Sequence, residues 1–401
     1  MNILFLTLAY PEKANSRGIY IDLMNELKSR GNNITVVTPT EKRNNKETYI
    51  SDCNGVKVLR VKTGNIQKTN KIEKGISTLL IESQFIKAIK KELKNVKFDL
   101  IMYSTPPITF EKVIKYIKNR DNAKSYLLLK DIFPQNAVDL NMISKNGLIY
   151  KYFRKKEEKL YKISDYIGCM SERNKEYILE HNSWLDHSKV EICPNSIEPL
   201  EFNEIPKDEK LSIRNKHNLP NDSTIIVYGG NLGKPQGIDF LMEVLESNKN
   251  NSDVFFLIVG GGTEYSKISN WIELNSPKNC LLYSMLPKED YDNLIKACDI
   301  GLILLDNRFT IPNFPSRLLS YMEIGIPVIA ATDKNTDVGI VIENGDFGYW
   351  CESGDLTEFN NLIKKISINR DNLIEMGKNG RLYLEDNYTV KTSADIIINR
   401  I

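Results

Sequence analysis

Short apolar runs alternate with amphipathic helical segments along almost all of the 401 residues, and this alternation restricts the fold more than any other feature. In the first half, the runs predicted as strands are residues 3–8, 34–39, 56–61, 100–103, 125–129, 166–169 and 190–192. In the second half, they are residues 224–228, 255–259, 280–283, 300–304 and 328–330. Because helical segments lie between these runs, each half predicts a doubly wound parallel sheet with helices on both faces.

A segment rich in Pro, Asn, Asp and Lys interrupts the alternation at residues 197–221, and we interpret it as an interdomain linker. The sequence therefore predicts an N-terminal Rossmann-like domain over residues 1–198 and a C-terminal one over residues 199–379. A last helix, at about residues 380–401, is expected to pack back on the first domain. Ligands bind beyond the carboxyl ends of the strands in such sheets, so a cleft where two such edges face each other is the expected site.

Charge is distributed unevenly along the chain. Residues 1–200 contain 34 Lys and Arg against 23 Asp and Glu, and the remaining residues contain 20 against 29. A basic half indicates an anionic partner, such as a membrane surface, a phosphorylated lipid or nucleic acid. A general enrichment in lysine on solvated helix faces would give the same counts.

Cysteine and histidine limit the cofactor chemistry. The six cysteines have no paired spacing, which favours free thiols in a reducing compartment. Three histidines without ligand spacing argue against a histidine metal site. The apolar start, residues 1–8, lacks a basic leader and a cleavage site, and no apolar run is long enough to span a bilayer, so we expect only peripheral membrane contact.

Residues 314–330 predict a helix start, a cation and a buried strand in close succession. Pro315 and Ser316 mark the start of a helix, and Arg317 adds a guanidinium that matches phosphate oxygens. Unpaired N–H groups at a helix start suit an anion. Because Leu318 lies at this helix start, we include it in the expected site. An ordinary helix–strand connection would have the same pattern.

Three glycine-bearing loops follow predicted strands. They are residues 10–18, ending at Gly18; residues 228–237, with Gly230 and Lys234; and residues 259–264, with Gly262. None matches a P-loop or the dinucleotide fingerprint, and a tight turn explains any one of them. Together, with Lys234 and Arg317 nearby, they favour binding of a nucleotide diphosphate.

Several distinct motifs follow one another along nearly the whole chain. They are residues 10–18, Lys130-Asp131-Ile132-Phe133-Pro134, Pro194-Asn195-Ser196, residues 229–237, residues 260–264, Ala297-Cys298-Asp299-Ile300 and residues 315–330. In these motifs the chain resembles the retaining glycosyltransferases of family 4, which have the GT-B fold of two Rossmann-like domains facing across a cleft. The motifs at Asp131 and at residues 230–237 resemble the bacterial capsule and O-antigen subgroup that transfers hexosamines or N-acetylfucosamine.

The chain departs from the family pattern at several positions. Many members carry an arginine and a lysine where this chain has Asn231 and Gln236. A glutamate pair common in the family is replaced by Pro312 and Ser320, and Lys130 stands where many members have histidine. Glu323, one turn beyond Ser320, is expected either on the same helix face or in a packing role.

The resemblance implies a metal-independent transferase that uses a nucleotide-sugar donor and no cofactor. The residues it assigns to the donor diphosphate are Gly18, Asn231, Lys234, Gln236, Ser316, Arg317 and Leu318. Those assigned to the nucleotide or sugar are Gly230, Gly262, Glu264, Asn313, Phe314 and Ser320. The catalytic candidates are Asp131 and Lys130; Asp131 would contact the acceptor or handle its proton, or would only cap the following turn.

A basic stripe on the predicted helix 149–163 is expected to face a membrane. Its residues are Lys151, Arg154, Lys155, Lys156, Lys159 and Lys162, beside Tyr152, Phe153, Leu160 and Tyr161. It would rest on anionic lipid near a lipid-linked saccharide acceptor, at the cytoplasmic face of the cell membrane, or form a solvated surface helix. A UDP-N-acetylhexosamine 2-epimerase-like enzyme and a degenerate nucleotide-binding scaffold remain alternatives, while nucleic-acid binding is not expected.

Overall fold

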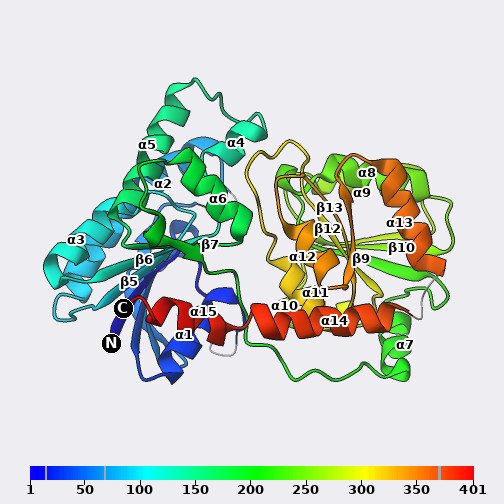
Figure 1. The fold of residues 1–401 in the computed structure, drawn as a ribbon, viewed down its shortest axis with the longest axis horizontal. Coiled ribbons are helices and arrows are strands. Elements are labelled where there is room, and N and C mark those ends of the chain that lie inside the picture. The colour runs from blue at the N-terminus through cyan, green and yellow to red at the C-terminus, as the bar shows by residue number, and fades with distance from the viewer. Residues whose placement is uncertain (14–15, 67–68, 369–371) are drawn as a thin grey trace. The chain divides into compact units, whose positions relative to one another are not determined.

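The computed structural model describes residues 1–13, 16–66, 69–368 and 372–401. The chain forms two compact units (Figure 1). The first contains Met1–Glu198 and Thr389–Ile401, and the second contains Pro199–Tyr388.

The first unit is built on an eight-stranded sheet in the order β3-β4-β2-β1-β5-β6-β7-β8. Its strands are β1 (Asn2–Leu6), β2 (Asn33–Glu41), β3 (Tyr49–Cys53), β4 (Val56–Thr63), β5 (Leu100–Ser104), β6 (Lys124–Leu129), β7 (Tyr166–Cys169) and β8 (Val190–Ile192). Only the edge pair β3–β4 is antiparallel. All other neighbours are parallel, so the carboxyl ends of seven strands meet at one edge.

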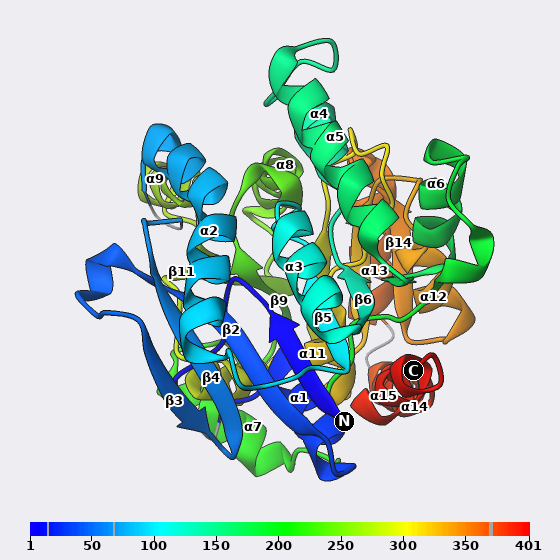
Figure 2. The same ribbon diagram turned by 90° about the vertical axis from the view of Figure 1, so that its left-hand side faces the viewer.

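Helices cover both faces of this sheet (Figure 2). They are α1 (Ile19–Ser29), α2 (Lys71–Glu92), α3 (Glu111–Asp121), α4 (Gln135–Asp139), α5 (Leu148–Ile163), α6 (Glu172–His181) and α15 (Val390–Ile398). Helices α1 and α15 share one apolar core with the central strands, and α2, α3 and α5 lie on the opposite face. Short 3-10 turns occur at η1 (Lys42–Asn44) and η2 (His187–Lys189).

The second unit has a six-stranded, fully parallel sheet in the order β11-β10-β9-β12-β13-β14. Its strands are β9 (Thr224–Asn231), β10 (Val254–Gly261), β11 (Cys280–Tyr283), β12 (Ile300–Leu304), β13 (Val328–Thr332) and β14 (Gly348–Glu352). Its helices are α7 (Lys207–Lys216), α8 (Ile238–Asn248), α9 (Tyr265–Asn275), α10 (Lys288–Ile295), α11 (Arg317–Glu323), α12 (Val338–Asn344), α13 (Leu356–Ile368) and α14 (Asn372–Asn387), with the turn η3 (Lys234–Gln236). The apolar strand residues alternate between the two helix layers, as expected for a sheet covered on both faces. The GT-B fold expected from the sequence is confirmed: both units are Rossmann-like.

Two strands and three helices of the described chain were not predicted from the sequence. Strands β3 and β14 lie at or near sheet edges, where alternation is weak, and α4 and α12 are only 5 and 7 residues long. Helix α7 lies inside the segment interpreted as a linker. It is fixed by Arg214, which donates to Ala297 at 3.0 Å and pairs with Asp299 at 2.7 Å, and these contacts join residues far apart in the sequence.

The predicted return of the C-terminal segment begins later than expected. Helix α14, which starts before residue 380, belongs to the second unit and packs on α11. A Cβ on Gly377 would lie 1.9 Å from the carbonyl oxygen of Gly325, so this packing requires glycine. Only residues from Thr389 onward join the first unit, where Val390 donates to Ile197 at 3.0 Å and α15 packs on α1.

Across the described ranges, no helix combines the length and the apolar character that a membrane span requires.

Candidate active site

Arg317, the first residue of α11, places its guanidinium at the carboxyl end of β9. Its central carbon lies 4.3 Å from the centre of the Tyr228 ring, a cation–π geometry. The Nη1 atom is buried and has no hydrogen-bond partner among the described residues. A Cβ on Gly230 would lie 3.5 Å from Nη2, so the guanidinium borders the glycine loop directly. The structure thus provides a charged donor that lacks an acceptor.

Two further tyrosines hold the end of β9 in place. The Tyr321 hydroxyl donates to the Val227 carbonyl at 3.0 Å and accepts from the Gly229 N–H at 3.3 Å. Burial raises the pKa of Tyr321 to about 12, so its hydroxyl stays protonated. A Cβ on Gly229 would lie 1.9 Å from the Tyr291 hydroxyl, which explains glycine at this position. The sequence analysis missed these tyrosines, although Tyr321 follows Arg317 by one helical turn.

Two side-chain amides, those of Asn231 and Gln236, bond to each other at the end of β9. The Asn231 side-chain amide donates to the Gln236 side-chain oxygen at 2.8 Å, and the Tyr228 hydroxyl donates to the Asn231 carbonyl at 2.8 Å. Gly237 has a left-handed conformation (φ 58°), and a Cβ there would lie 2.9 Å from the Leu305 carbonyl. Asn231 and Gln236 therefore shape the loop as a neutral pair, and exposed Lys234 carries its positive charge.

The second and third glycine loops touch through their backbones. A Cβ on Gly260 would lie 1.9 Å from the Gly230 carbonyl oxygen, and one on Gly262 would lie 2.2 Å from that of Leu232. The Glu264 N–H donates to Leu232 at 2.9 Å. Glu264 is the N-cap residue of α9, but its side chain makes no capping hydrogen bond. It accepts instead from the Thr263 hydroxyl at 3.3 Å.

The other residues predicted to bind the nucleotide-sugar donor near α11 differ in burial and in their contacts. Ser316 is its N-cap residue without a side-chain cap, and Ser320 is partly buried. Leu318 is fully buried, and its N–H donates to the Pro315 carbonyl at 3.2 Å. Its side chain and its N–H group therefore both have partners within the protein. The Asn313 carbonyl accepts from the Thr336 hydroxyl at 2.5 Å. The Phe314 ring lies 5.9 Å from that of Tyr388.

Glu323 faces the start of the second unit. Its carboxylate accepts from the Leu200 N–H at 3.0 Å, and Arg381 donates to the carbonyls of Glu323 and Leu200 at 3.0 and 2.7 Å. Glu323 thus anchors the entering segment, which is the packing role that the sequence analysis considered.

In the first unit, Lys130 and Asp131 follow β6 at its carboxyl end. Their backbone N–H groups both donate to the Thr105 hydroxyl, at 2.9 and 3.1 Å. Their side chains have different partners: the Lys130 ammonium donates to the Cys193 carbonyl at 3.3 Å, and Asp131 accepts from the Asn136 amide at 2.8 Å. Burial lowers the pKa of Lys130 to about 8 and raises the pKa of Asp131 to about 6. Both groups therefore titrate near neutral pH, as acid–base residues at active sites often do.

Gly18 is the N-cap residue of α1, and the space beside its Cα is open. Its φ of 154° favours glycine, and a Cβ built there would meet no atom within 4 Å. Its N–H donates to Asp22 at 3.1 Å, so this group is already used. The nearby Tyr10-Pro11 turn is held by buried Arg60, which donates to their carbonyls at 2.9 and 2.6 Å. No local pattern marked Arg60, because it is 49 residues away in the sequence.

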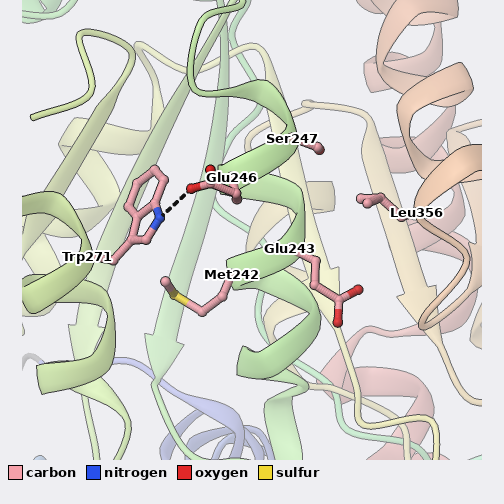
Figure 3. A pocket seen from close by; sticks show the side chains of 6 residues that line it. All are labelled: Met242, Glu243, Glu246, Ser247, Trp271 and Leu356. Carbon is pink, nitrogen blue, oxygen red and sulfur yellow. Dashed lines mark hydrogen bonds between the residues drawn. The ribbon is translucent and has the colours of Figure 1, made fainter. Parts of the chain in front are cut away.

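A hollow of about 460 Å³ lies in the helix layer of the second unit, outside the predicted site (Figure 3). Its lining residues are Met242, Glu243, Glu246, Ser247, Trp271 and Leu356. The Trp271 indole donates to Glu246 at 2.9 Å. None of the predicted site residues lines it. Within residues 1–13, 16–66, 69–368 and 372–401, no group of three or more His, Cys, Asp or Glu could hold a metal ion.

Comparison with known proteins finds similarity to glycosyltransferases. Residues 209–383 match the family described as Glycosyl transferases group 1. This match, which lies within the second unit, and the relatives below support a glycosyltransferase enzyme. This transferase is 21% identical to the probable glycosyltransferase WbjE of Pseudomonas aeruginosa, over 80% of this chain and 78% of WbjE. It is 23% identical to the putative colanic acid biosynthesis glycosyl transferase WcaI of Escherichia coli K12, over 38% of each chain.

The transferase also has the fold of solved enzymes. HepE from Anabaena, solved in complex with UDP and glucose, superposes with a TM-score of 0.71 at 14% identity. The match covers 99% of this chain and 98% of HepE. The expectation of a GT-B glycosyltransferase is therefore confirmed.

Proposed function

We propose that this enzyme transfers a sugar, with retention, from a UDP-linked N-acetylhexosamine or related 6-deoxy sugar to a lipid-linked or saccharide acceptor in cell-surface polysaccharide biosynthesis. In this reaction the bond from the sugar C1 to the diphosphate breaks, and a bond to the acceptor hydroxyl forms on the same face. The hydroxyl proton passes to the leaving diphosphate. The names of WcaI and of the HepE complex, which specify colanic acid biosynthesis, UDP and glucose, support this class of reaction.

The observation that carries the proposal is the Arg317 guanidinium beside the glycine loop, whose buried Nη1 atom has no hydrogen-bond partner among the described residues. A buried N–H group of a cation is costly without an acceptor, and a diphosphate would supply both the charge and the missing oxygen. Negative charge grows on the diphosphate as its bond to C1 breaks. A fixed guanidinium, with Lys234 on the neighbouring turn, would stabilise that charge most in the transition state. We accordingly propose that transfer needs no metal and no cofactor.

Asp131 is the proposed acceptor contact in the first unit. With a pKa of about 6, it is mostly ionised at pH 7 and is a stronger base than an ordinary aspartate. It would accept a hydrogen bond from the acceptor hydroxyl and orient the oxygen that attacks C1. Its bond from Asn136 fixes the carboxylate, and the turn-capping role is not needed to explain its position.

Helix α5 offers a surface for the proposed lipid-linked acceptor at the cytoplasmic face of the membrane. Leu148 is 84% exposed and Ile149 59% exposed, and Leu148, Tyr152, Lys155 and Lys159 recur at the spacing of one helix face. Apolar tips beside lysines fit an anionic bilayer surface.

Part of the predicted basic stripe has another role. Arg154 pairs with buried Glu157 at 2.6 Å, and Leu160 and Tyr161 are buried on the side of α5 that packs on the unit. The stripe available to lipid therefore consists of the exposed lysines Lys151, Lys155, Lys159 and Lys162.

Calorimetry with UDP, GDP, ADP and NAD, each with magnesium and with EDTA, tests the donor assignment. We expect UDP to bind best and its Kd to be the same in EDTA. A preference for another nucleotide, or a strict need for magnesium, would contradict it. Turnover of UDP-N-acetylhexosamine to its epimer without acceptor would favour the epimerase alternative, and binding without turnover across a donor and acceptor panel would favour a scaffold.

A further inference from the structure

Lys130 is a partly buried lysine without a carboxylate partner among the described residues. Its ammonium donates to the Cys193 carbonyl at 3.3 Å. Two ionisable groups influence its pKa, the thiols of Cys193 and Cys169. Cys169 is the last residue of β7, and Cys193 directly follows β8. Burial raises the pKa of both thiols, so both are neutral at pH 7. Among the described residues, none supplies a carboxylate for this cation.

Two other half-buried lysines in the described chain are paired with carboxylates. Lys118 contacts Asp165 at 2.7 Å, and Lys210 contacts Asp299 at 2.6 Å. Lysine is seldom removed from water unless a counter-charge accompanies it. Lys130 instead is half-buried at the carboxyl end of β6. The neighbouring carboxylate, Asp131, is held by Asn136 and does not form an ion pair with it.

We propose that Lys130 binds an anionic group of the acceptor, a carboxylate or a phosphate, and so selects acidic acceptors. The inference rests on the proposed function, in which the first unit receives the acceptor. The ammonium has two N–H groups beyond the one used by Cys193, and these can hold two oxygens of such a group. A neutral saccharide would leave the charge uncompensated and would bind less well.

The test is calorimetric titration of the full chain with glucuronate, inorganic phosphate and glucose, comparing the wild type with Lys130→Gln and Lys130→Arg. We expect Lys130→Gln to weaken binding of at least one anion by about tenfold, the effect of losing one charge-assisted contact. Lys130→Arg should retain it, and glucose should not distinguish the proteins. Loss for glucuronate alone would indicate an acidic sugar, and loss for phosphate alone would indicate a phosphorylated acceptor. Equal anion binding by wild type and Lys130→Gln would overturn the proposal.

A second measurement on the wild type does not depend on how the variants fold. At pH 8, glucuronate binding to Lys130 should take up roughly half a proton, because an anion raises a pKa that lies near 8. Glucuronate titrations in two buffers of different ionisation enthalpy reveal that uptake, and glucuronate binding without it would overturn the assignment of a carboxylate to Lys130. UDP affinity, measured separately, reports on Arg317 in the second unit, so failure of the donor assignment and failure of this inference are distinguishable.

Discussion

The Phe153 ring of α5 packs edge-on against Phe133, with ring centres 5.0 Å apart, and so joins the exposed helix to the turn that carries Asp131. On the same helix, the Tyr150 hydroxyl donates to Gln135 at 3.4 Å. Helix α5, which we propose faces a membrane, and the loop of Asp131, which we propose contacts the acceptor, therefore share a packed contact in the first unit. A lipid-linked acceptor bound at α5 would have its head group close to that loop.

Replacing Leu148 by glutamate should reduce binding to anionic vesicles by about tenfold or more. The change removes an apolar tip from the bilayer and adds a charge that the lipid repels. Co-sedimentation with phosphatidylglycerol vesicles measures it. The matched control is Leu274→Glu on α9, because Leu274 is 85% exposed and Leu148 84%. Equal loss in both variants would show that α5 has no special role.

Replacing Arg317 by alanine should weaken UDP binding by about tenfold or more, since one or two charge-assisted contacts of about 1.5–3 kcal/mol are lost. Calorimetry measures the Kd, and thermal unfolding checks the fold. Lys296→Ala removes a cation that pairs with Glu209 at the surface of the same unit, and it should leave the Kd unchanged. Wild-type affinity in Arg317→Ala would remove Arg317 from the site.

Replacing Gly262 by alanine should displace the third glycine loop and weaken both stability and UDP binding. The new Cβ would lie 2.2 Å from the Leu232 carbonyl oxygen, and overpacking of this kind costs about 1–3 kcal/mol. Gly261→Ala is the neighbouring control, because a Cβ there meets nothing within 4 Å. Thermal unfolding and UDP titration of the two variants should separate them clearly; similar behaviour would contradict the close loop contact.

Replacing Asp131 by asparagine should lower kcat/KM strongly while raising stability at neutral pH. The folded pKa of about 6 exceeds the unfolded value of 3.8. Its contribution to stability is therefore fully present below about pH 4 and is lost as the pH rises through 6. Urea unfolding at pH 7 should give a free energy of unfolding higher by about 1–3 kcal/mol in the variant.

The pH profile of the wild type gives an independent check on Asp131. If the carboxylate orients the acceptor, kcat/KM should fall below pH 6, and Asp131→Asn should not show that fall. A variant with the wild-type rate and profile would leave Asp131 only a structural role.

Local patterns were sufficient for most of the framework. Strands β7, β11 and β12 have the predicted limits, because each is a short apolar run bounded by polar or turn residues. Elements that are short or have a weak apolar periodicity, such as β14 and α12, were not predicted from the sequence. Helix α7 was hidden by its polar composition, and its position depends on the pairing of Arg214 with Asp299, 85 residues away.

The sequence by itself determined the two sheets, the glycine loops and the identity of Arg317 as the cation beside them, since these depend on periodicity and on residue type. Only the tertiary structure decided which of those residues are available to a ligand. It paired Asn231 with Gln236, buried Leu318 in the core and left Arg317 and Lys130 without counter-ions among the described residues. The physical reason is that burial and charge pairing depend on residues brought together from distant parts of the chain, which no local pattern records.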